Sequence, residues 1–353
     1  MAQTASIRWP RGAGRRERPR KWAPGLAASL AIVGMVVCTI LFILRRQDTR
    51  SFDPYYYMYA PLQNVVSTGE LSSSSSSRLA LDHSFGFFDD LSDAQWRRMQ
   101  RNHALTFPNH FGDLMQHSNT IRDRGNREAL RNSNWWWGDN FHAEFHCPMM
   151  LRLPTTGQAD GPKWVCDPHR LLRRQNCLIY SIGSNGKAEF EQGIRDVVGD
   201  HCEIHTFDPI GYNKRNGNFS MALEGLAAFH QYGYGTEEDA RRHQYKTLAQ
   251  IMDDLGHTGR TIDIFKIDCE WCEWHTYPQW LGGVDIRQIL VETHNAPMPE
   301  AKKFFYELHD AGYVIFSKEA NYQNAAGAVE YGFVKLLPDF FRFNDSTYMY
   351  KAS

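Results

Sequence analysis

The sequence predicts an α/β protein with a doubly wound, mostly parallel β-sheet. From about residue 161 onwards, short apolar runs alternate with longer stretches whose apolar residues recur at helical spacing. This alternation is typical of a parallel sheet covered by helices on both faces. Three of the runs end in glycine or acidic residues, and ligands of doubly wound sheets bind at the carboxyl ends of the strands. The same pattern therefore predicts both the fold and the place of a site.

The apolar runs are expected to be strands because they are short and bounded by turn residues. The expected parallel strands are 177–182, 202–207, 226–230, 262–267 and 286–291. The stretches predicted to be helices are 187–198, 245–255 and 299–311. The last two runs, 313–317 and 329–336, are joined by residues 321–327, which favours an antiparallel hairpin at one edge of the sheet.

Residues 25–44 form a candidate transmembrane helix. They are twenty consecutive uncharged residues, and a helix of that length spans about 30 Å, the hydrocarbon thickness of a bilayer. Seven basic residues precede them and three follow closely, so the positive-inside rule makes residues 1–24 a cytosolic basic tail. We expect a signal-anchored, single-pass type II membrane protein of the Golgi or endoplasmic reticulum. A polybasic leader that is later removed is the alternative.

The charge is divided unevenly along the chain. Residues 1–50 carry ten Lys and Arg against two acidic residues, a net charge of +8, so the overall charge of −1 leaves −9 on the other 303 residues. A mildly acidic body does not favour a nucleic-acid-binding surface. Hydrophobic residues make up 42% of the chain, which excludes a wholly disordered protein.

Cysteine usage agrees with a lumenal domain. One of the seven cysteines lies in the candidate anchor, and the other six can form disulfides in an oxidising compartment, with fifteen pairings left open. These six are Cys147, Cys166, Cys177, Cys202, Cys269 and Cys272. Glycosylation sequons at Asn218 and Asn344 predict a glycoprotein in the same topology.

The segment between the anchor and the main domain divides into two parts. Residues 45–80 are expected to be a disordered stem, because the serine run 72–77 cannot bury enough apolar surface to offset its ordering entropy. Residues 81–160 are expected to be a partly helical cap. The main domain then covers 161–353.

Two patterns of possible metal ligands are both weak. His142, Glu144 and His146 do not have the spacing of a zinc-binding H-E-x-x-H helix. Cys269-x-x-Cys272 has no second C-x-x-C, so a disulfide or a packing role is favoured. We therefore expect no metal.

A glycine turn and an acid follow the first two predicted strands. Gly183-Ser-Asn-Gly186 allows a ligand to approach the backbone next to a helix N-terminus, although a tight turn without a ligand is the alternative. Asp208 is placed to accept hydrogen bonds from both hydroxyls of a ribose. Its alternative role is a helix cap or turn residue, since Asp-Pro often starts a turn.

Three carboxylates crowd the end of the strand 262–267. They are Asp268, Glu270 and Glu273. Crowding of like charges raises at least one pKa, which suits a proton acceptor near neutral pH. His294, after the next strand, is expected to face the same crevice and is a further candidate for catalysis.

Together these motifs resemble a methyltransferase-like domain related to the FkbM-type, S-adenosylmethionine-dependent methyltransferases. The resemblance rests on Tyr180-Ser-Ile-Gly-Ser-Asn-Gly186, His205-Thr-Phe-Asp208-Pro, the stretch 265–274 and the lead-in segment 160–170. The motifs follow the family's order over about residues 145–340. The family pattern often has Gly where this chain has Trp271.

The resemblance implies a seven-stranded, Rossmann-like class I methyltransferase fold with S-adenosylmethionine as cofactor. It implies that the cofactor-binding residues are Ser181, Gly183, Ser184, Asn185, Gly186, Asp208 and Asp268. An alcohol acceptor needs a base, for which Asp268, Glu270 and His294 are the candidates.

The leading hypothesis is a lumenal methyltransferase that O-methylates a glycan or another lumenal acceptor such as a protein. The alternatives are a type II membrane glycosyltransferase and a non-catalytic methyltransferase-like binding domain, with an NAD oxidoreductase as a weaker reading. The glycosyltransferase would hold a metal and a nucleotide sugar at Asp89-Asp90 or Asp253-Asp254.

Overall fold

A computed structural model describes residues 78–110, 140–155, 161–241, 244–294, 298–321 and 328–343. The predicted tail, the predicted transmembrane helix, the stem up to residue 77 and Asn344 lie outside these ranges. Within them, no helix is both long and apolar enough to span a bilayer. Residues 74–353 form one compact unit.

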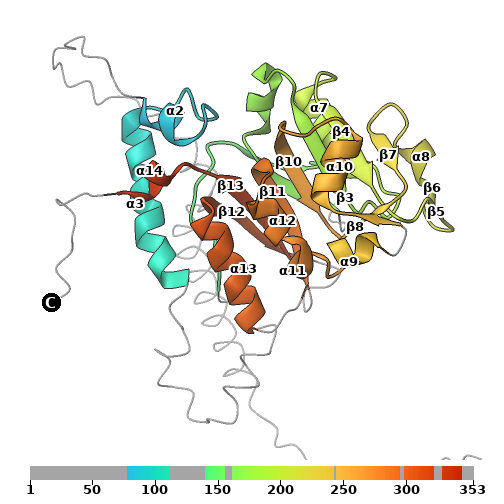
Figure 1. Ribbon diagram of the computed structural model, residues 1–353. Coiled ribbons are helices and arrows are strands. Elements are labelled where there is room, and N and C mark those ends of the chain that lie inside the picture. Colours follow the sequence, from blue (N-terminus) through green and yellow to red (C-terminus); the bar gives the residue numbers. More distant parts are fainter. Residues whose placement is uncertain are drawn as a thin grey trace, which may run out of the picture. The chain divides into compact units, whose positions relative to one another are not determined.

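A seven-stranded mixed sheet lies at the centre of this unit (Figure 1), in the order β12-β13-β11-β10-β3-β4-β7. Its strands are β3 (Leu178–Ile182), β4 (Glu203–Phe207), β7 (Ala228–His230), β10 (Thr261–Ile267), β11 (Asp285–His294), β12 (Tyr313–Ala320) and β13 (Ala328–Lys335). The pairs from β7 to β11 are parallel, whereas β13 pairs antiparallel with both β11 and β12. The doubly wound sheet, its seven strands and the antiparallel edge hairpin are thus confirmed, and the fold is the Rossmann-like class I methyltransferase fold.

Two element boundaries differ from the predictions for identifiable reasons. β11 continues beyond Val291 to His294, because its polar end residues find partners: the Thr293 hydroxyl donates to the carbonyl of Val329 on β13. The predicted helix 245–255 begins only at Leu248, as α10 (Leu248–Asp254). Thr247 caps it, forming a reciprocal capping box with Gln250.

Helices cover one face of the sheet: α10, α11 (Glu273–Thr276), α12 (Pro278–Leu281) and α13 (Met298–Asp310). α13 is helical and attached here because Ala301, Phe304, Phe305 and Leu308 recur at i, i+3, i+4 and i+7 and are all buried in one cluster with β10, β11 and β13.

The opposite face carries α7 (Glu189–Val198), η1 (Pro168–Arg173) and the hairpin of β1 (Met150–Leu153) with β2 (Lys163–Cys166). The helices α2 (Leu79–His83), α3 (Asp93–His110) and α14 (Pro338–Phe341) are grouped at the β12 end in Figure 1. Trp96 of α3 and Ile194 of α7 belong to the same buried cluster. The described parts of the predicted cap therefore share a core with the main domain.

Short elements complete the unit: β5 (Tyr212–Asn213), β6 (Gly217–Asn218), α8 (Phe219–Ala222), β8 (Gly233–Tyr234), α9 (Glu237–Ala240) and β9 (Tyr245–Lys246). Asn218 of the predicted sequon is exposed and its side chain caps α8.

The six cysteines form three disulfides, which resolves the pairing that the sequence left open. Cys147 pairs with Cys166, Cys177 with Cys202, and Cys269 with Cys272. The first joins β2 to the segment before β1, and the second joins the residues just before β3 and β4. The third closes a loop after β10.

Candidate active site

A cavity of about 630 Å³ lies at the carboxyl ends of β3, β4 and β10. Its volume is within the usual range for small-molecule sites, about 300–1,000 Å³. Predicted site residues that line it are Gly183, Ser184, Asn185, Asp208, Asp268 and Glu270. The cavity lies where the strand order reverses, between β3 and β10, as expected for a doubly wound sheet.

The glycine turn is shaped by the packing of the protein itself. Gly183 and Gly186 have φ of +75° and +73°, which is the left-handed region that glycine favours. A Cβ on Gly183 would lie 1.8 Å from the carbonyl oxygen of Asp268, and one on Gly186 would lie 2.1 Å from the ring of Phe219. Both glycines are therefore required by neighbours that the sequence pattern does not reveal.

Asp208 holds this turn in place. Its Oδ2 accepts hydrogen bonds from the backbone N–H groups of Ser184 at 3.0 Å and Asn185 at 2.8 Å, and its Oδ1 accepts one from Ile210 at 2.8 Å. A carboxylate offers about four acceptor positions, so Oδ1 keeps capacity for one more hydrogen bond. The alternative role as a turn residue is confirmed, and the ribose contact stays a prediction.

Asp268 is held by two buried lysines. Its Oδ2 lies 3.3 Å from Nζ of Lys163 and 4.0 Å from Nζ of Lys266. Burial alone would raise the pKa of Asp268, but the two ammonium groups outweigh burial and lower this pKa to about 2. The raised pKa expected for at least one of the three crowded carboxylates is therefore not that of Asp268, which is an anion and a hydrogen-bond acceptor rather than a strong base.

Lys163 of β2 is a site residue that the sequence analysis missed. Its side chain is 2% exposed and its Nζ lies 2.6 Å from Glu330 and 3.6 Å from Glu292, besides Asp268. Burial opposes the charged form, but these three carboxylates outweigh burial and raise the pKa of Lys163. One lysine in a short strand carries no sequence signal of partners more than a hundred residues away.

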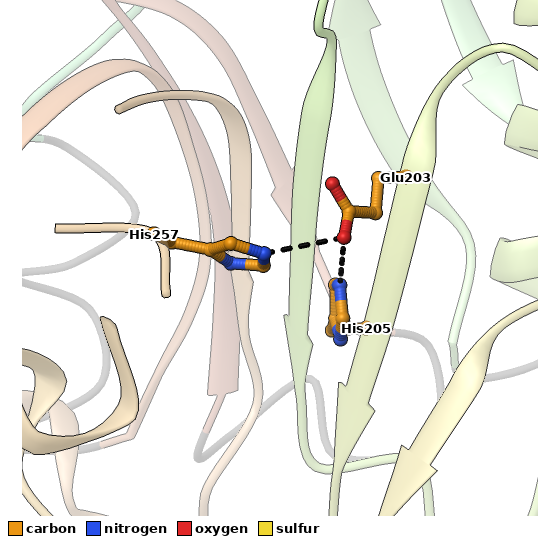
Figure 2. Close-up of side chains that lie close together, drawn as sticks. All are labelled: Glu203, His205 and His257. Carbon is orange, nitrogen blue, oxygen red and sulfur yellow. Dashed lines mark hydrogen bonds and ion pairs between the residues drawn. The ribbon is translucent and has the colours of Figure 1, made fainter. Parts of the chain in front are cut away.

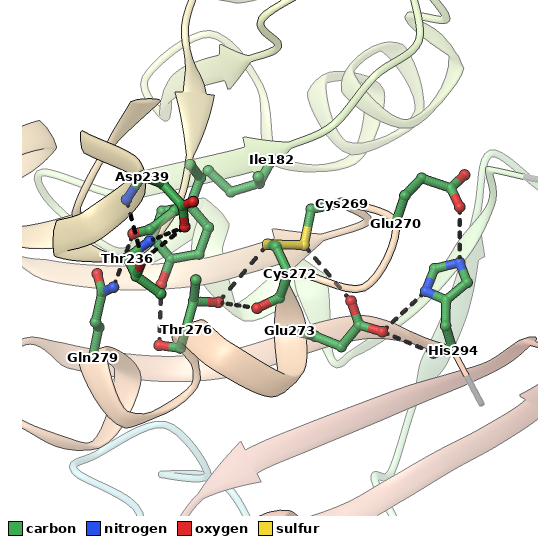
Figure 3. Close-up of a disulfide and its surroundings, with 12 residues drawn as sticks. Ile182, Thr236, Asp239, Cys269, Glu270, Cys272, Glu273, Thr276, Gln279 and His294 are labelled. Carbon is green, nitrogen blue, oxygen red and sulfur yellow. Dashed lines mark hydrogen bonds and ion pairs between the residues drawn. A yellow bond between two sulfur atoms is a disulfide. The ribbon is translucent and has the colours of Figure 1, made fainter. Parts of the chain in front are cut away.

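The loop after β10 is constrained by the disulfide between Cys269 and Cys272 (Figure 3). Glu270 and Trp271, between them, have φ of +52° and +84°. Trp271 thus occupies, at the cavity wall, a backbone conformation that normally requires glycine, at the position where the resembling family often has Gly. The Glu270 side chain is 82% exposed at the cavity rim.

His294 is enclosed by carboxylates (Figure 3). Its Nδ1 lies 3.0 Å from Glu273 and its Nε2 lies 3.2 Å from Glu270. Burial alone would lower the pKa of His294, but the hydrogen bond and charge of Glu273, with Glu292 and Glu270, raise this pKa to about 9. The imidazole is therefore protonated at neutral pH and has no free lone pair. This arrangement argues against the predicted role of His294 as a base.

Two other predicted cofactor residues lie beside the cavity rather than in its wall. Ser181 is fully buried within β3, and Gly186 faces the ring of Phe219. Ile182, the neighbour of Ser181, lines the cavity instead, because successive side chains of a strand point to opposite faces.

The remaining cavity wall comes from elements that carried no sequence motif. Tyr234 of β8, Tyr245 of β9 and His275 of α11 line it, with Asp239 of α9. The Asp239 carboxylate accepts hydrogen bonds from the backbone N–H and the hydroxyl of Thr236 (Figure 3), so it serves the cap of α9. His275 is exposed and is an ionisable group of this wall that the sequence pattern did not indicate.

The strand order, the glycine turn and the acids at neighbouring strand ends define an α/β protein with a cavity at the carboxyl ends of a doubly wound sheet. Residues 78–335 match the model of a family described as "Methyltransferase domain". Because the match covers more than half of the chain, the chain belongs to this methyltransferase domain family. The methyltransferase part of the resemblance is thereby confirmed, and the relation to FkbM-type enzymes stays a prediction.

Solved structures that resemble this chain are methyltransferase-related proteins of low identity. Fibrillarin of Aeropyrum pernix, solved with natively bound S-adenosyl-L-methionine, is 10% identical over 53% of this chain and 82% of that chain, with a TM-score of 0.30. An rRNA methylase of Streptococcus thermophilus is 11% identical over 48% of this chain and 95% of that chain, with a TM-score of 0.31. These values are low, and the identification of the fold rests on the strand order instead. No curated protein matches the chain.

Proposed function

We propose that this protein is an S-adenosylmethionine-dependent methyltransferase whose cofactor occupies the cavity at the carboxyl ends of β3, β4 and β10. The observation that carries the proposal is that one cavity is lined by the glycine turn, by Asp208 and by Asp268, at the reversal of strand order. The family match supports the reaction type.

The residues present fit such a cofactor. The backbone of the glycine turn is held by Asp208 and needs no rearrangement to form one wall. The spare acceptor position on Asp208 Oδ1 suits a ribose hydroxyl. The ionised carboxylate of Asp268 suits a cationic or N–H-bearing part of the cofactor, because its charge is fixed by Lys163 and Lys266.

S-adenosylmethionine supplies an electrophilic methyl group when it is bound, and the site contributes mainly by positioning the acceptor. Glu270 at the cavity rim and the exposed His275 in the wall are candidates to take a proton from an alcohol acceptor. Asp268 is too weak a base for this task, and His294 is already protonated. The exposed ring of Trp271 adds apolar surface beside the acceptor.

The proposal includes membrane anchoring through residues 25–44, a lumenal catalytic domain and a glycan or protein acceptor. Three disulfides in the described part of the chain support an oxidising compartment. The glycosyltransferase alternative is not favoured, because its candidate acids serve ion pairs: Asp90 lies 2.6 Å from Arg170, and Asp254 contacts Lys246.

The test is transfer of labelled methyl groups from S-adenosylmethionine to components of a Golgi or endoplasmic reticulum lumenal extract, with the full chain in detergent. We expect a labelled product, and we expect its loss with Asp268→Asn. The matched control is Asp200→Asn, an exposed acid before β4 at the other edge of the sheet. If the protein binds S-adenosylmethionine but labels neither the Golgi nor the endoplasmic reticulum extract, the non-catalytic alternative is favoured. If it neither binds the cofactor nor transfers the methyl group, the proposal is overturned.

A further inference from the structure

A second group of side chains, which carry atoms able to bind a metal, lies at the amino ends of the parallel strands, opposite the cavity (Figure 2). We call this side of the sheet the amino edge and the cavity side the carboxyl edge. Glu203 begins β4, His205 follows two residues later on the same face of that strand, and His257 lies in the turn after α10. Glu203 Oε1 is 3.2 Å from Nε2 of His205 and 3.2 Å from Nε2 of His257. One ligand atom from each of the three residues lies within 4.8 Å of the other two.

We propose that Glu203, His205 and His257 form a zinc-binding site. Two imidazoles and one carboxylate are a ligand set that zinc takes, with bonds of about 2.0–2.2 Å in tetrahedral geometry. Ligand atoms in that geometry are about 3.3 Å apart, close to both distances from Glu203 Oε1. The third distance, between the two imidazole nitrogens, is at most 4.8 Å.

Neighbouring residues orient both histidines for this role. His205 Nδ1 lies 2.8 Å from His230 Nε2, and His257 Nδ1 lies 2.7 Å from the hydroxyl of Tyr180. Each imidazole thus has its Nδ1 occupied and its Nε2 directed at Glu203. Zinc-binding histidines almost always donate their second ring N–H to an acceptor such as a carboxylate, a backbone carbonyl or water. His230 Nε2 and the Tyr180 hydroxyl oxygen can accept these two hydrogen bonds, which would leave each Nε2 for the metal.

The carboxylate is oriented in the same way and is accessible. Arg260 lies 2.6 Å from Glu203 Oε2, which leaves Oε1 facing the histidines. The Glu203 side chain is 45% exposed, and both Glu203 and Arg260 line an open depression of about 770 Å³. An ion therefore has a path to the site, and water can supply the fourth ligand.

Without zinc, the same residues form a hydrogen-bonded network in which both Nε2–H groups donate to Glu203. With zinc bound, both Nε2 atoms coordinate the ion, so their hydrogen bonds to Glu203 are lost and each Nδ1 becomes a donor instead of an acceptor.

The zinc site has a role distinct from the proposed methyl transfer. β4 runs from Glu203 at the amino edge to Phe207 at the cavity. Because a strand rises about 3.3 Å per residue, the length of β4 separates the two sites. An ion at Glu203 would cross-link the start of β4 to the turn after α10, and it would stabilise the fold without touching the cofactor cavity.

The experiment titrates zinc into the tag-free full chain after chelator treatment and follows heat and thermal unfolding. Cobalt(II) replaces zinc in a parallel titration, because its visible absorption reports tetrahedral coordination. We expect one ion per chain, a rise in unfolding temperature on zinc addition, and a loss of affinity of about tenfold or more for Glu203→Gln and His257→Gln. Glu203→Gln keeps an oxygen that accepts the histidine hydrogen bonds, so it is the variant expected to fold. The control His146→Gln removes an exposed histidine outside the group and should bind as the unchanged protein does.

The proposal is overturned if zinc does not bind saturably, or if Glu203→Gln binds zinc as tightly as the unchanged protein.

Discussion

The two edges of the sheet place the same residue types in opposite charge states. At the carboxyl edge, His294 is buried beside Glu273, Glu292 and Glu270, and its pKa rises to about 9. At the amino edge, burial lowers the pKa of His205 and of His257, and it lowers the pKa of His230 to about 4. The amino-edge histidines are neutral at pH 7, whereas the carboxyl-edge histidine is a cation.

The difference shows that the number of buried carboxylates decides the state of a buried base. At the amino edge, the carboxylate of Glu203 contacts both His205 and His257. This carboxylate is half exposed and also forms an ion pair with Arg260. At the carboxyl edge, five acids surround two lysines and one histidine: Asp268, Glu270, Glu273, Glu292 and Glu330. Several nearby carboxylates raise the pKa of His294, whereas beside the half-exposed Glu203 burial dominates and lowers the pKa of His205 and His257.

The largest expected effect comes from Lys163→Met, which removes the ammonium group at the centre of the carboxyl edge. Three carboxylates then lose a buried partner, and breaking a buried ion pair costs about 3–5 kcal/mol. Chemical denaturation measures the free energy of unfolding. Lys214→Met, at an exposed position, is the control and should change it by about 0.5 kcal/mol or less. Equal effects of the two variants would show that the carboxyl edge is not held by Lys163.

Removal of one disulfide from each edge compares their cross-links. Cys177 and Cys202 are 25 residues apart at the amino edge, whereas Cys269 and Cys272 are 3 apart at the carboxyl edge. The loop-closure entropy model gives about 3.5 kcal/mol for the longer loop and about 2 kcal/mol for the shorter one. Denaturation of the two Cys→Ser double variants should show this order. The reverse order would mean that the short loop stabilises the protein by more than chain entropy.

The close approach between the glycine turn and β10 is tested by Gly183→Ala. The new methyl group meets the Asp268 carbonyl, and overpacking of this kind costs about 1–3 kcal/mol beyond the backbone strain. Gly256→Ala is the matched control, because Gly256 also has a positive φ of +69° but has open space around its Cβ position. The difference in unfolding free energy between the two variants isolates the contact. If the two variants had the same free energy of unfolding, the glycine turn would not be in close contact with the Asp268 carbonyl after β10.

The smallest effect concerns the pH dependence at His294. Its pKa is raised from 6.5 in the unfolded chain to about 9 in the folded protein, so the stabilisation is complete below pH 6.5 and is lost as pH rises through 9. In Glu273→Gln the histidine should titrate at lower pH, as NMR of its ring protons would measure. A His294 signal that titrates near pH 6.5 in the unchanged protein would contradict the assignment.

The sequence predicted the fold well because strands and helices leave local signals. The apolar run 262–267 and the periodic stretch 299–311 were recognisable from spacing alone, and both are present as β10 and α13. Turn chemistry was also local, so Gly183 and Asp208 were correctly placed at one cavity.

The charge states of the site could not be predicted in the same way. Crowded acids suggested a raised pKa for at least one of Asp268, Glu270 and Glu273. The pKa of Asp268 is lowered instead, because Lys163 reaches this carboxylate from a strand 105 positions earlier. The zinc-site candidate was missed for the same reason, since His257 is far from Glu203 in the chain and joins it only through the fold.

Calorimetric titration of the full chain with S-adenosylmethionine tests whether the cavity at the carboxyl edge binds this cofactor. We expect saturable binding of one molecule per chain and a loss of about tenfold or more in affinity for Asp208→Asn, with the affinity of Asp200→Asn unchanged. A chain that is folded by circular dichroism but shows no heat of binding, or an Asp208→Asn variant that binds as tightly as the unchanged protein, would contradict this expectation.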